Sequence, residues 1–248
     1  MNQTMHKLNT SILLTLIFLV FSCTSVLETA PEPISEPLGI QNAKAMDPDP
    51  LRYSDAINAF KQTDSLTPSP AGALLFVGSS SIRGWTTLAE DLNDFDVINR
   101  GFGGSHFSDL NYSINDLVFA HRPSAIFVYE GDNDIAWGKT PERVYKDYLT
   151  FLSLVREKWM DMPIYFISIK PSLERIAIID EMAQANTLIR THTEKDDRLY
   201  YVDVFSTMLD DTGKPKEAIF GHDGLHMNAQ GYALWTNAVK EVLDQAKQ

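Results

Sequence analysis

The feature that most restricts the fold of this chain is the alternation of short apolar runs with longer segments of helical spacing. Five apolar runs of four to six residues recur between residues 73 and 204, and such runs are typical of strands that are buried on both faces. Strands that alternate with helices in this way predict a parallel sheet covered by helices on both sides. We therefore expect an α/β chain that forms one three-layer sandwich with five parallel strands in the flavodoxin-like order.

The expected elements follow from these runs and from the helical segments between them. The predicted strands cover residues 73–77, 96–99, 125–129, 164–169 and 199–204. The predicted helices cover residues 51–62, 105–121, 141–159, 173–193 and 228–246. Thr140 is the expected N-cap of the third helix, and Pro141 suits the first helical position. Ligands of such sheets bind beyond the carboxyl ends of the strands, so the loops there are where chemistry is expected.

Four unusual clusters of residues lie in those loops. Three directly follow a predicted strand: residues 78–85 (Gly-Ser-Ser-Ser-Ile-Arg-Gly-Trp), 99–105 (Asn-Arg-Gly-Phe-Gly-Gly-Ser) and 130–134 (Glu-Gly-Asp-Asn-Asp). The fourth lies beyond the last strand, at residues 221–226 (Gly-His-Asp-Gly-Leu-His). Because the carboxyl ends of parallel strands meet at one edge of a sheet, we expect the four clusters to lie together.

The residue types in these clusters are those that acyl transfer requires. A serine attacks an ester carbonyl only with a base beside it, and a carboxylate can hold that base in one tautomer. Glycine N–H groups and an asparagine amide can donate to the oxyanion that forms. Asp223 and His226 are three residues apart, so one turn can present both to a single serine. The sequence therefore predicts an acyl-transfer site assembled from all four clusters.

Each cluster alone also fits a structural role. Ser80 can cap a helix, and residues 101–104 and 131–134 can form ordinary turns. Two other motifs fail on single positions. His106 stands where the dinucleotide fingerprint G-x-G-x-x-G requires glycine, and Ile82 stands where the nucleophile elbow G-x-S-x-G requires its second glycine.

Metal binding is an alternative to a serine nucleophile. His222, Asp223 and His226 could ligate a cation, and so could Asp132 and Asp134. However, the chain has one cysteine, no H-E-x-x-H helix and no EF-hand spacing. We therefore expect neither a metal nor another cofactor.

The four clusters in this order resemble the sequence blocks of the SGNH hydrolases, the GDSL-type esterases and lipases. The resemblance extends over most of residues 51–248. It implies a flavodoxin-like α/β/α fold and metal-independent hydrolysis of esters or thioesters. Ser80 takes the place of the nucleophile, and Asp223 and His226 match the family's D-x-x-H. The backbone of Ser80, Gly104 and the side chain of Asn133 take the places of the oxyanion hole.

One position departs from the family pattern. The family has an acid directly before the serine, where this chain has Ser79. Ser79 is outside the catalytic set, so we interpret the change as the mark of a subgroup. Because three serines are consecutive, Ser79 and Ser81 are alternative nucleophiles, although the register with Gly78 favours Ser80.

Several side chains adjoin the four clusters. Phe102, Ile135 and Trp137 are candidates for the walls of an acyl or alcohol pocket, with core packing as the alternative for each. Arg83 and Arg100 are expected to brace loops rather than bind substrate. The sequence has no long apolar insertion that could form a lid, and this favours short acyl groups such as acetyl.

The N-terminal segment has the features of an export signal. Residues 11–21 form an uncharged, mostly apolar run. The run is too short to span about 30 Å of hydrocarbon, but it has the length of a signal-peptide core. It ends at the only cysteine, Cys23, in a Val-Phe-Ser-Cys sequence that resembles a bacterial lipobox. We expect residues 1–22 to be a signal peptide, Cys23 to be lipidated and the protein to reside in the cell envelope; soluble export and an uncleaved anchor are the alternatives.

Composition and charge complete the predictions. Residues 23–50 are rich in proline and glutamate without an apolar period, which predicts a solvated tether before a hydrolase domain at residues 51–248. The formal net charge of −12 disfavours nucleic acid and anionic lipid headgroups as partners. We expect a small-molecule or glycan ester as substrate, with the membrane reached only through a lipid at Cys23. The alternative function is a glycan-binding module that has lost catalysis.

Overall fold

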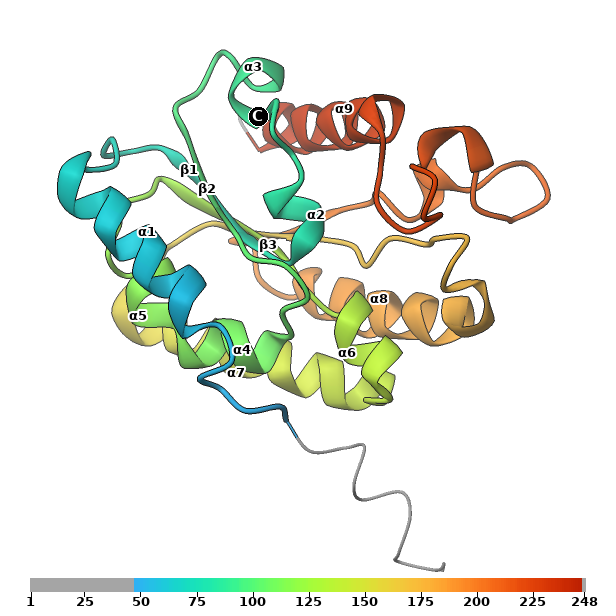
Figure 1. Ribbon diagram of the computed structural model, residues 1–248, viewed down its shortest axis with the longest axis horizontal. Helices are drawn as coiled ribbons and strands as arrows, with labels where there is room; N and C mark the ends of the chain where they lie inside the picture. The colour runs from blue at the N-terminus through green and yellow to red at the C-terminus, as the bar shows by residue number, and fades with distance from the viewer. Residues whose placement is uncertain (1–46, 247–248) are drawn as a thin grey trace, which may run out of the picture. The chain divides into compact units, whose positions relative to one another are not determined.

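The computed structural model describes residues 47–246, which form layers of helices around one parallel sheet (Figure 1). In this part of the chain the sheet has five strands in the order β2-β1-β3-β4-β5, and every neighbouring pair is parallel. The strands are β1 (Leu74–Gly78), β2 (Val97–Gly101), β3 (Ala125–Tyr129), β4 (Ile164–Ile167) and β5 (Leu199–Val202). The predicted α/β sandwich with flavodoxin-like strand order is confirmed.

Helices of very different lengths precede, connect and follow the strands. The long ones are α1 (Ser54–Leu66), α7 (Pro141–Lys158), α8 (Ile179–Thr193) and α9 (Ala229–Gln245). The short ones are α2 (Ser80–Arg83), α3 (Leu88–Asp91), α4 (Phe107–Tyr112), α5 (Ile114–Leu117) and α6 (Asp132–Trp137). The 3₁₀ turns described are η1 (Ile176–Ile178), η2 (Ser206–Met208) and η3 (Glu217–Ile219).

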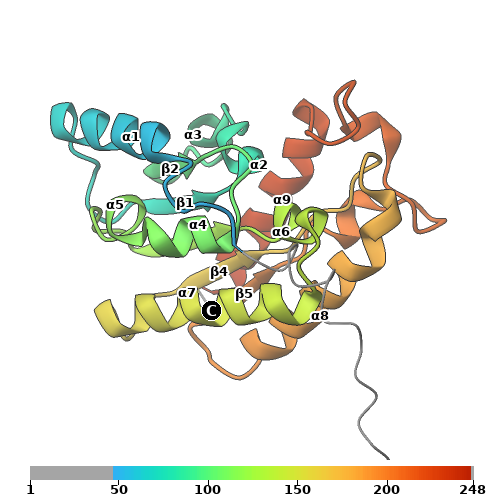
Figure 2. The same ribbon diagram turned by 60° about the horizontal axis from the view of Figure 1, so that its bottom comes forward.

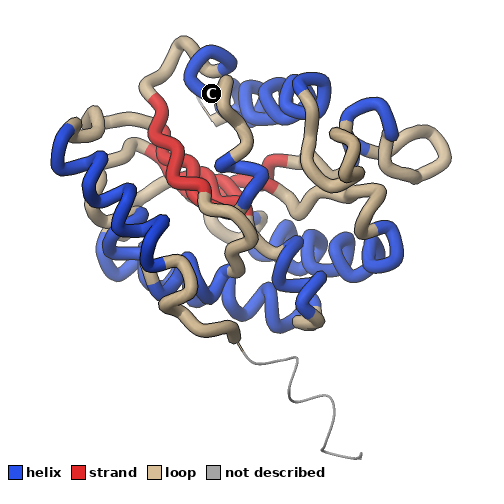
Figure 3. Tube along the Cα trace, viewed as in Figure 1, coloured by secondary structure: helices blue, strands red, loops and turns tan. Residues whose placement is uncertain are grey.

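The alternation of side chains along the strands gives the sheet two buried faces. On β1, Leu75 and Val77 belong to one core with α1, α4, α5, α7 and α8, whereas Leu74 and Phe76 belong to a second core with α3 and α9. Figure 3 shows the strands enclosed between these helices, and Figure 2 shows α7 and α8 side by side along one face. Because both faces are covered, the strands are continuous apolar runs, which is why the sequence revealed them.

Two predicted helices are interrupted in the structure. Residues 105–121 form α4 and α5 rather than one helix, since the backbone of Ser113 leaves helical geometry at φ −96° and ψ 15°. Residues 173–193 become helical α8 only from Ile179, after η1. The segment before η1 donates instead to another loop, because the N–H groups of Leu173 and Glu174 bond the carbonyl of Gly224 at 2.9 and 3.1 Å. Both interruptions arise from local or tertiary contacts that periodicity does not reveal.

Other local predictions can be compared directly. The Thr140 cap is confirmed, because its side chain accepts from the N–H of Arg143 at 3.2 Å. Residues 131–134, where an ordinary turn was an alternative, begin α6 after Gly131, whose φ is +118°. Asn228 caps α9 by accepting from the N–H of Gln230 at 2.9 Å.

Contacts of the folded part begin before residue 51, where the sequence placed the start of the domain. The carboxylate of Asp47 lies 2.8 Å from Nζ of Lys139 and 2.6 Å from Nη2 of Arg143. The predicted signal peptide, Cys23 and most of the tether lie outside the described residues. No helix within residues 47–246 has the length and the apolar character needed to cross a membrane.

Gly78 ends β1 where the chain turns towards α2, and it gives a stability prediction. Its φ is +145°, and a Cβ on it would stand 2.0 Å from the backbone oxygen of Tyr129. We predict that Gly78→Ala lowers the free energy of unfolding by about 3 kcal/mol or more, because a clash between backbones inside a sheet is not relieved by side-chain rotation. Equilibrium unfolding in urea measures the loss.

Gly213→Ala is the matched control for this substitution. Gly213 also has a positive φ, +79°, but a Cβ there would meet nothing within 4 Å. It should therefore show only the conformational cost, about 1 kcal/mol. Equal losses for the two variants would show that the close approach at Gly78 does not limit stability.

Candidate active site

The first predicted site residue, Ser80, begins α2 directly after β1. The N–H of Ser79 still bonds the carbonyl of Tyr129 on β3 at 3.2 Å, and the carbonyl of Ser79 already accepts from Ile82 and Arg83 at 3.0 and 3.1 Å. The chain therefore changes from strand to helix within one residue. Ser79 and Ser81 are buried and Ser80 is half-buried, so among the three serines Ser80 has the most accessible side chain.

Asp223 and His226 lie on one turn between η3 and α9, as their spacing predicted. Oδ1 of Asp223 closes the turn by accepting from the N–H groups of Leu225 and His226, each at 3.0 Å. Oδ2 of Asp223 lies 2.6 Å from Nδ1 of His226. Nε2 of His226 lies 3.0 Å from Oγ of Ser80. The structure thus brings these three side chains into one continuous hydrogen-bonded chain.

The protonation states of this chain follow from its partners. The hydrogen bond from His226, followed by the backbone N–H bonds, lowers the pKa of the Asp223 carboxyl well below its usual value. A carboxylate only accepts, so Nδ1 of His226 is the donor to Asp223, and in the neutral imidazole Nε2 then has a lone pair towards the hydroxyl of Ser80. This is the tautomer that can take a proton from a serine.

Hydrogen bonds fix the turn that carries His226 and the start of α9 behind it. The N–H of Gly221 bonds the carbonyl of His226 at 2.8 Å. The amide of Asn228 donates to the carbonyls of Ala218 and Phe220 at 2.8 and 3.0 Å. From α9, the hydroxyl of Tyr232 donates to the backbone oxygen of Ser81 at 3.0 Å, which ties α9 directly to α2.

The two other predicted donors flank Ser80 on neighbouring loops. β1 lies between β2 and β3 in the sheet. Gly104 follows β2 and has a φ of +77°, while Asn133 lies in the first turn of α6 after β3. Nδ2 of Asn133 donates to the backbone oxygen of Ser105 at 3.0 Å, and its Oδ1 accepts from Nη2 of Arg175 at 2.9 Å. Backbone and amide donors therefore stand on both sides of the strand that leads to Ser80.

The suggested pocket residues divide into two groups. Phe102 and Ile135 are buried in the core that α4 and α7 share, so the alternative of core packing holds for them. Trp137 is exposed, and its ring lies edge-on to that of His106 with centroids 5.9 Å apart.

The two predicted bracing arginines lie at different depths. Arg100 is buried and pairs with Asp64, so it braces its loop as expected. The guanidinium of Arg83 lies close to Gly103. A Cβ added to Gly103 would stand 2.3 Å from Nη1 of Arg83.

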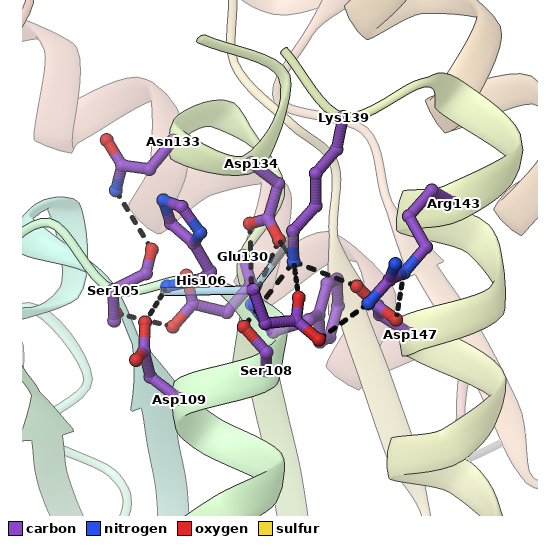
Figure 4. A network of polar contacts seen from close by, with 12 residues as sticks. Ser105, His106, Ser108, Asp109, Glu130, Asn133, Asp134, Lys139, Arg143 and Asp147 are labelled. Carbon is purple, nitrogen blue, oxygen red and sulfur yellow. Dashed lines mark hydrogen bonds and ion pairs between the residues drawn. The ribbon is translucent and has the colours of Figure 1, made fainter. Parts of the chain in front are cut away.

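A buried charge network beneath Asn133 was not identified in the sequence (Figure 4). Nζ of Lys139 lies 2.9 Å from Asp134 and 2.9 Å from Asp147, and Nε of Arg143 lies 2.9 Å from Asp147. Burial raises the pKa of Asp134 to about 6, and Lys139 acts in the opposite direction. The available signal was Asp147, a charged residue on the otherwise apolar face of α7 that carries Val144 and Phe151.

Glu130 is the other buried acid of this region. Its Oε1 lies 2.6 Å from Oγ of Ser105. Burial, with the nearby charge of Asp134, raises the pKa of Glu130 well above its usual range. Both effects favour the protonated form of this side chain.

The same loops carry the residues that could have formed a metal centre. Within residues 47–246 no group of three His, Cys, Asp or Glu side chains is arranged to hold a metal ion. His222 is exposed, and the ring of His226 is engaged by Asp223 and Ser80 instead.

Comparison with known proteins identifies the family. The model of the GDSL-like lipase/acylhydrolase family matches residues 64–234, more than half of the chain. The chain belongs to this family. The matched range spans all four clusters, so this GDSL-family protein carries Ser80, Gly104, Asn133, Asp223 and His226 inside the family's own domain.

Solved structures with low sequence identity share the fold. A GDSL-like lipase from Bacteroides thetaiotaomicron has a TM-score of 0.65 at 17% identity, covering 77% of this chain and 98% of that one. A carbohydrate esterase family 3 protein from Talaromyces cellulolyticus has a TM-score of 0.58 at 15% identity, covering 71% and 98%.

A relative with another named activity matches only in part. N-acylneuraminate cytidylyltransferase from Escherichia coli is 24% identical over 204 residues. The match covers 77% of this GDSL-family protein and 43% of that relative, so the chain spans less than half of the relative's length.

The buried acid Glu130 gives a prediction about pH and stability. The pKa of its carboxyl is higher in the folded state than the ordinary value of 4.5 expected in the unfolded state. Above that value the unfolded state therefore binds fewer protons than the folded state, and the wild type loses stability as pH rises. Gln cannot ionise. We therefore predict that the free energy of unfolding of Glu130→Gln, relative to wild type, increases from pH 4 to pH 8, as measured by urea unfolding.

Glu157→Gln, at an exposed position on α7, is the control, and its difference from wild type should not change with pH. If Glu130→Gln and wild type ran parallel across the same range, Glu130 would titrate alike in both states.

Proposed function

We propose that this protein is a serine esterase that hydrolyses carboxylic esters with short acyl groups such as acetyl. The observation that carries the proposal is the chain of contacts from Asp223 through His226 to Ser80, at 2.6 and 3.0 Å. These residues come from turns 146 positions apart in the sequence. A hydroxyl, an imidazole and a carboxylate in this order are the parts that a serine hydrolase needs.

The first half of the reaction forms an acyl-enzyme. Nε2 of His226 takes the proton of Ser80 while Oγ attacks the ester carbonyl carbon, and Asp223 stabilises the imidazolium that results. The carbonyl oxygen becomes an oxyanion that accepts from the N–H groups of Ser80 and Gly104 and from Nδ2 of Asn133. His226 then gives its proton to the leaving alkoxide, and the alcohol departs. Ser80 now carries the acyl group.

The second half releases the acid. His226 takes a proton from a water molecule, and the hydroxide formed attacks the acyl carbon through a second oxyanion. Collapse of this intermediate returns the proton from His226 to Oγ of Ser80 and frees the carboxylic acid. Every step uses water together with side-chain and backbone groups of this chain.

The openness of the site supports a small acyl group. The side chains of His226 and Asp223 are 43% and 39% exposed, and Trp137 is the exposed aromatic residue near the α6 end of the site. A long acyl chain needs a large apolar surface to leave water, and Phe102 and Ile135 are committed to the core. A glycan ester is also a candidate substrate, because the carbohydrate esterase from Talaromyces cellulolyticus has a similar fold. We further propose that the protein is exported and held at the envelope by a lipid on Cys23.

The nucleophile can be tested directly. We predict that Ser80→Ala abolishes hydrolysis of p-nitrophenyl acetate and labelling by a fluorophosphonate probe, because the attacking oxygen is removed. Ser79→Ala should retain labelling, since Oγ of Ser79 is buried. Labelling that persists in Ser80→Ala and disappears in Ser79→Ala would move the nucleophile to Ser79. Activity that survives EDTA would distinguish this mechanism from metal-dependent hydrolysis. A wild-type protein without any hydrolytic activity would instead favour a glycan-binding module.

The oxyanion donor Asn133 gives a second test. We predict that Asn133→Ala keeps the fold and lowers kcat by roughly 10²–10³, the usual cost of one such donor. The measurement is kcat for p-nitrophenyl acetate with a far-UV circular dichroism check. Asn115→Ala, on an exposed position of α5, is the control and should leave kcat unchanged. An Asn133→Ala enzyme with full turnover would remove this side chain from the mechanism.

A further inference from the structure

The loop from Ser168 to Arg175, between β4 and η1, contacts two of the four site clusters although it belongs to none. The N–H groups of Leu173 and Glu174 bond the carbonyl of Gly224, in the turn that carries Asp223 and His226, at 2.9 and 3.1 Å. Nη2 of Arg175 donates to Oδ1 of Asn133 at 2.9 Å. One loop therefore touches both the acid–base turn and the side-chain donor of the proposed oxyanion hole.

Arg175 is itself fixed by a buried acid. Its Nη1 lies 3.2 Å from Oδ2 of Asp132, whose side chain is 4% exposed, while that of Arg175 is 17% exposed. Nζ of the buried Lys170 lies 3.6 Å from the same oxygen. A charge-assisted contact that is shielded from water in this way is stronger and better defined than one on the surface.

The contacts of Asn133 leave only one orientation for its amide. A guanidinium only donates, so the atom that faces Arg175 must be the amide oxygen. The backbone oxygen of Ser105 only accepts, so the atom 3.0 Å from it must be the amide nitrogen. A flipped amide would place like groups against each other at both ends. Within residues 47–246 the second N–H of Nδ2 has no acceptor, and it is free to donate to an oxyanion.

We propose that Arg175 is a positioning residue for the esterase reaction: it orients the amide of Asn133 and polarises it as an oxyanion donor. The proposal rests on the function proposed above. A cation that bonds Oδ1 draws electron density away from the amide nitrogen, so the free N–H becomes a stronger donor when negative charge forms on the substrate. Asp132 holds Arg175 in place. The contacts therefore lead from Asp132 to Arg175, from Arg175 to the amide of Asn133, and from that amide to the oxyanion.

This role differs from two others that an arginine beside an active site can have. A residue that binds the ground-state substrate changes KM, and its effect adds to that of Asn133. A residue that only stabilises the fold changes the free energy of unfolding without a specific link to Asn133. A residue that acts through Asn133 has no further effect on kcat once the amide is gone.

The test is a double-mutant cycle in the full chain with p-nitrophenyl acetate as substrate. We predict that Arg175→Met lowers kcat roughly tenfold to a hundredfold while KM stays within about twofold of wild type. In the Asn133→Ala background, Arg175→Met should lower kcat no further. Arg175→Lys, which retains the charge and one donor, should recover part of the lost kcat. Arg190→Met, on the exposed surface of α8, is the control and should leave kcat unchanged.

The possible outcomes separate this inference from the proposed function. Losses that multiply in the double variant, or a raised KM with unchanged kcat, would overturn the positioning role while Ser80-dependent activity still supports the esterase. Activity that persists in Ser80→Ala would instead contradict the esterase mechanism itself. If Arg175→Met does not fold by circular dichroism, Arg175→Lys carries the same cycle, and multiplying losses there would overturn the inference equally.

Discussion

The close approach of β1 to β3 at Gly78 is the constraint on which the rest of the site depends. Because Gly78 has no side chain, the backbone of Tyr129 can lie against it, and Ser79 can still bond the carbonyl of Tyr129 before the chain turns into α2. That change of direction within one residue lifts Ser80 out of the sheet. The contact from Ser80 to His226 is then completed by α9, which Tyr232 fastens to the backbone of Ser81.

The layout of the sheet explains how short clusters scattered over the sequence form one site. β1 is an inner strand with β2 and β3 on either side, so the loops with Gly104 and Asn133 flank Ser80 without any long insertion. β4 is the next strand in the sheet after β3. The loop that follows β4 contacts Asn133 through Arg175, and it contacts the turn of Asp223 through Gly224. The loops after β1, β2, β3 and β4 therefore each add a different component at the same edge, as is typical of parallel sheets.

The sequence predicted most of the framework because its signals are local. Buried parallel strands are continuous apolar runs, and Asp223 and His226 are close enough in sequence to form one turn. What it missed depends on partners that come from other loops. The contact of Arg175 with Asn133 can be inferred only once β4 is known to lie beside β3. The helix starts only at Ile179 because the segment before it bonds to Gly224 instead. Likewise, the sequence around Lys139 does not distinguish it from a surface lysine, because Asp134 and Asp147 are placed around it only by folding.

The segment after β3 shows why these missed partners matter for chemistry. Glu130, Asp132 and Asp134 are three buried acids within five residues, directly below the donor that would stabilise an oxyanion. Negative charge there opposes the formation of another anion nearby, and more strongly so where water is excluded. The structure offsets it in three ways: burial raises the pKa of Glu130 well above its usual range, Asp132 has Lys170 as well as Arg175 beside it, and Asp134 pairs with Lys139. In a chain with a net charge of −12, the proposed oxyanion hole therefore lies beside acids whose negative charge is offset locally.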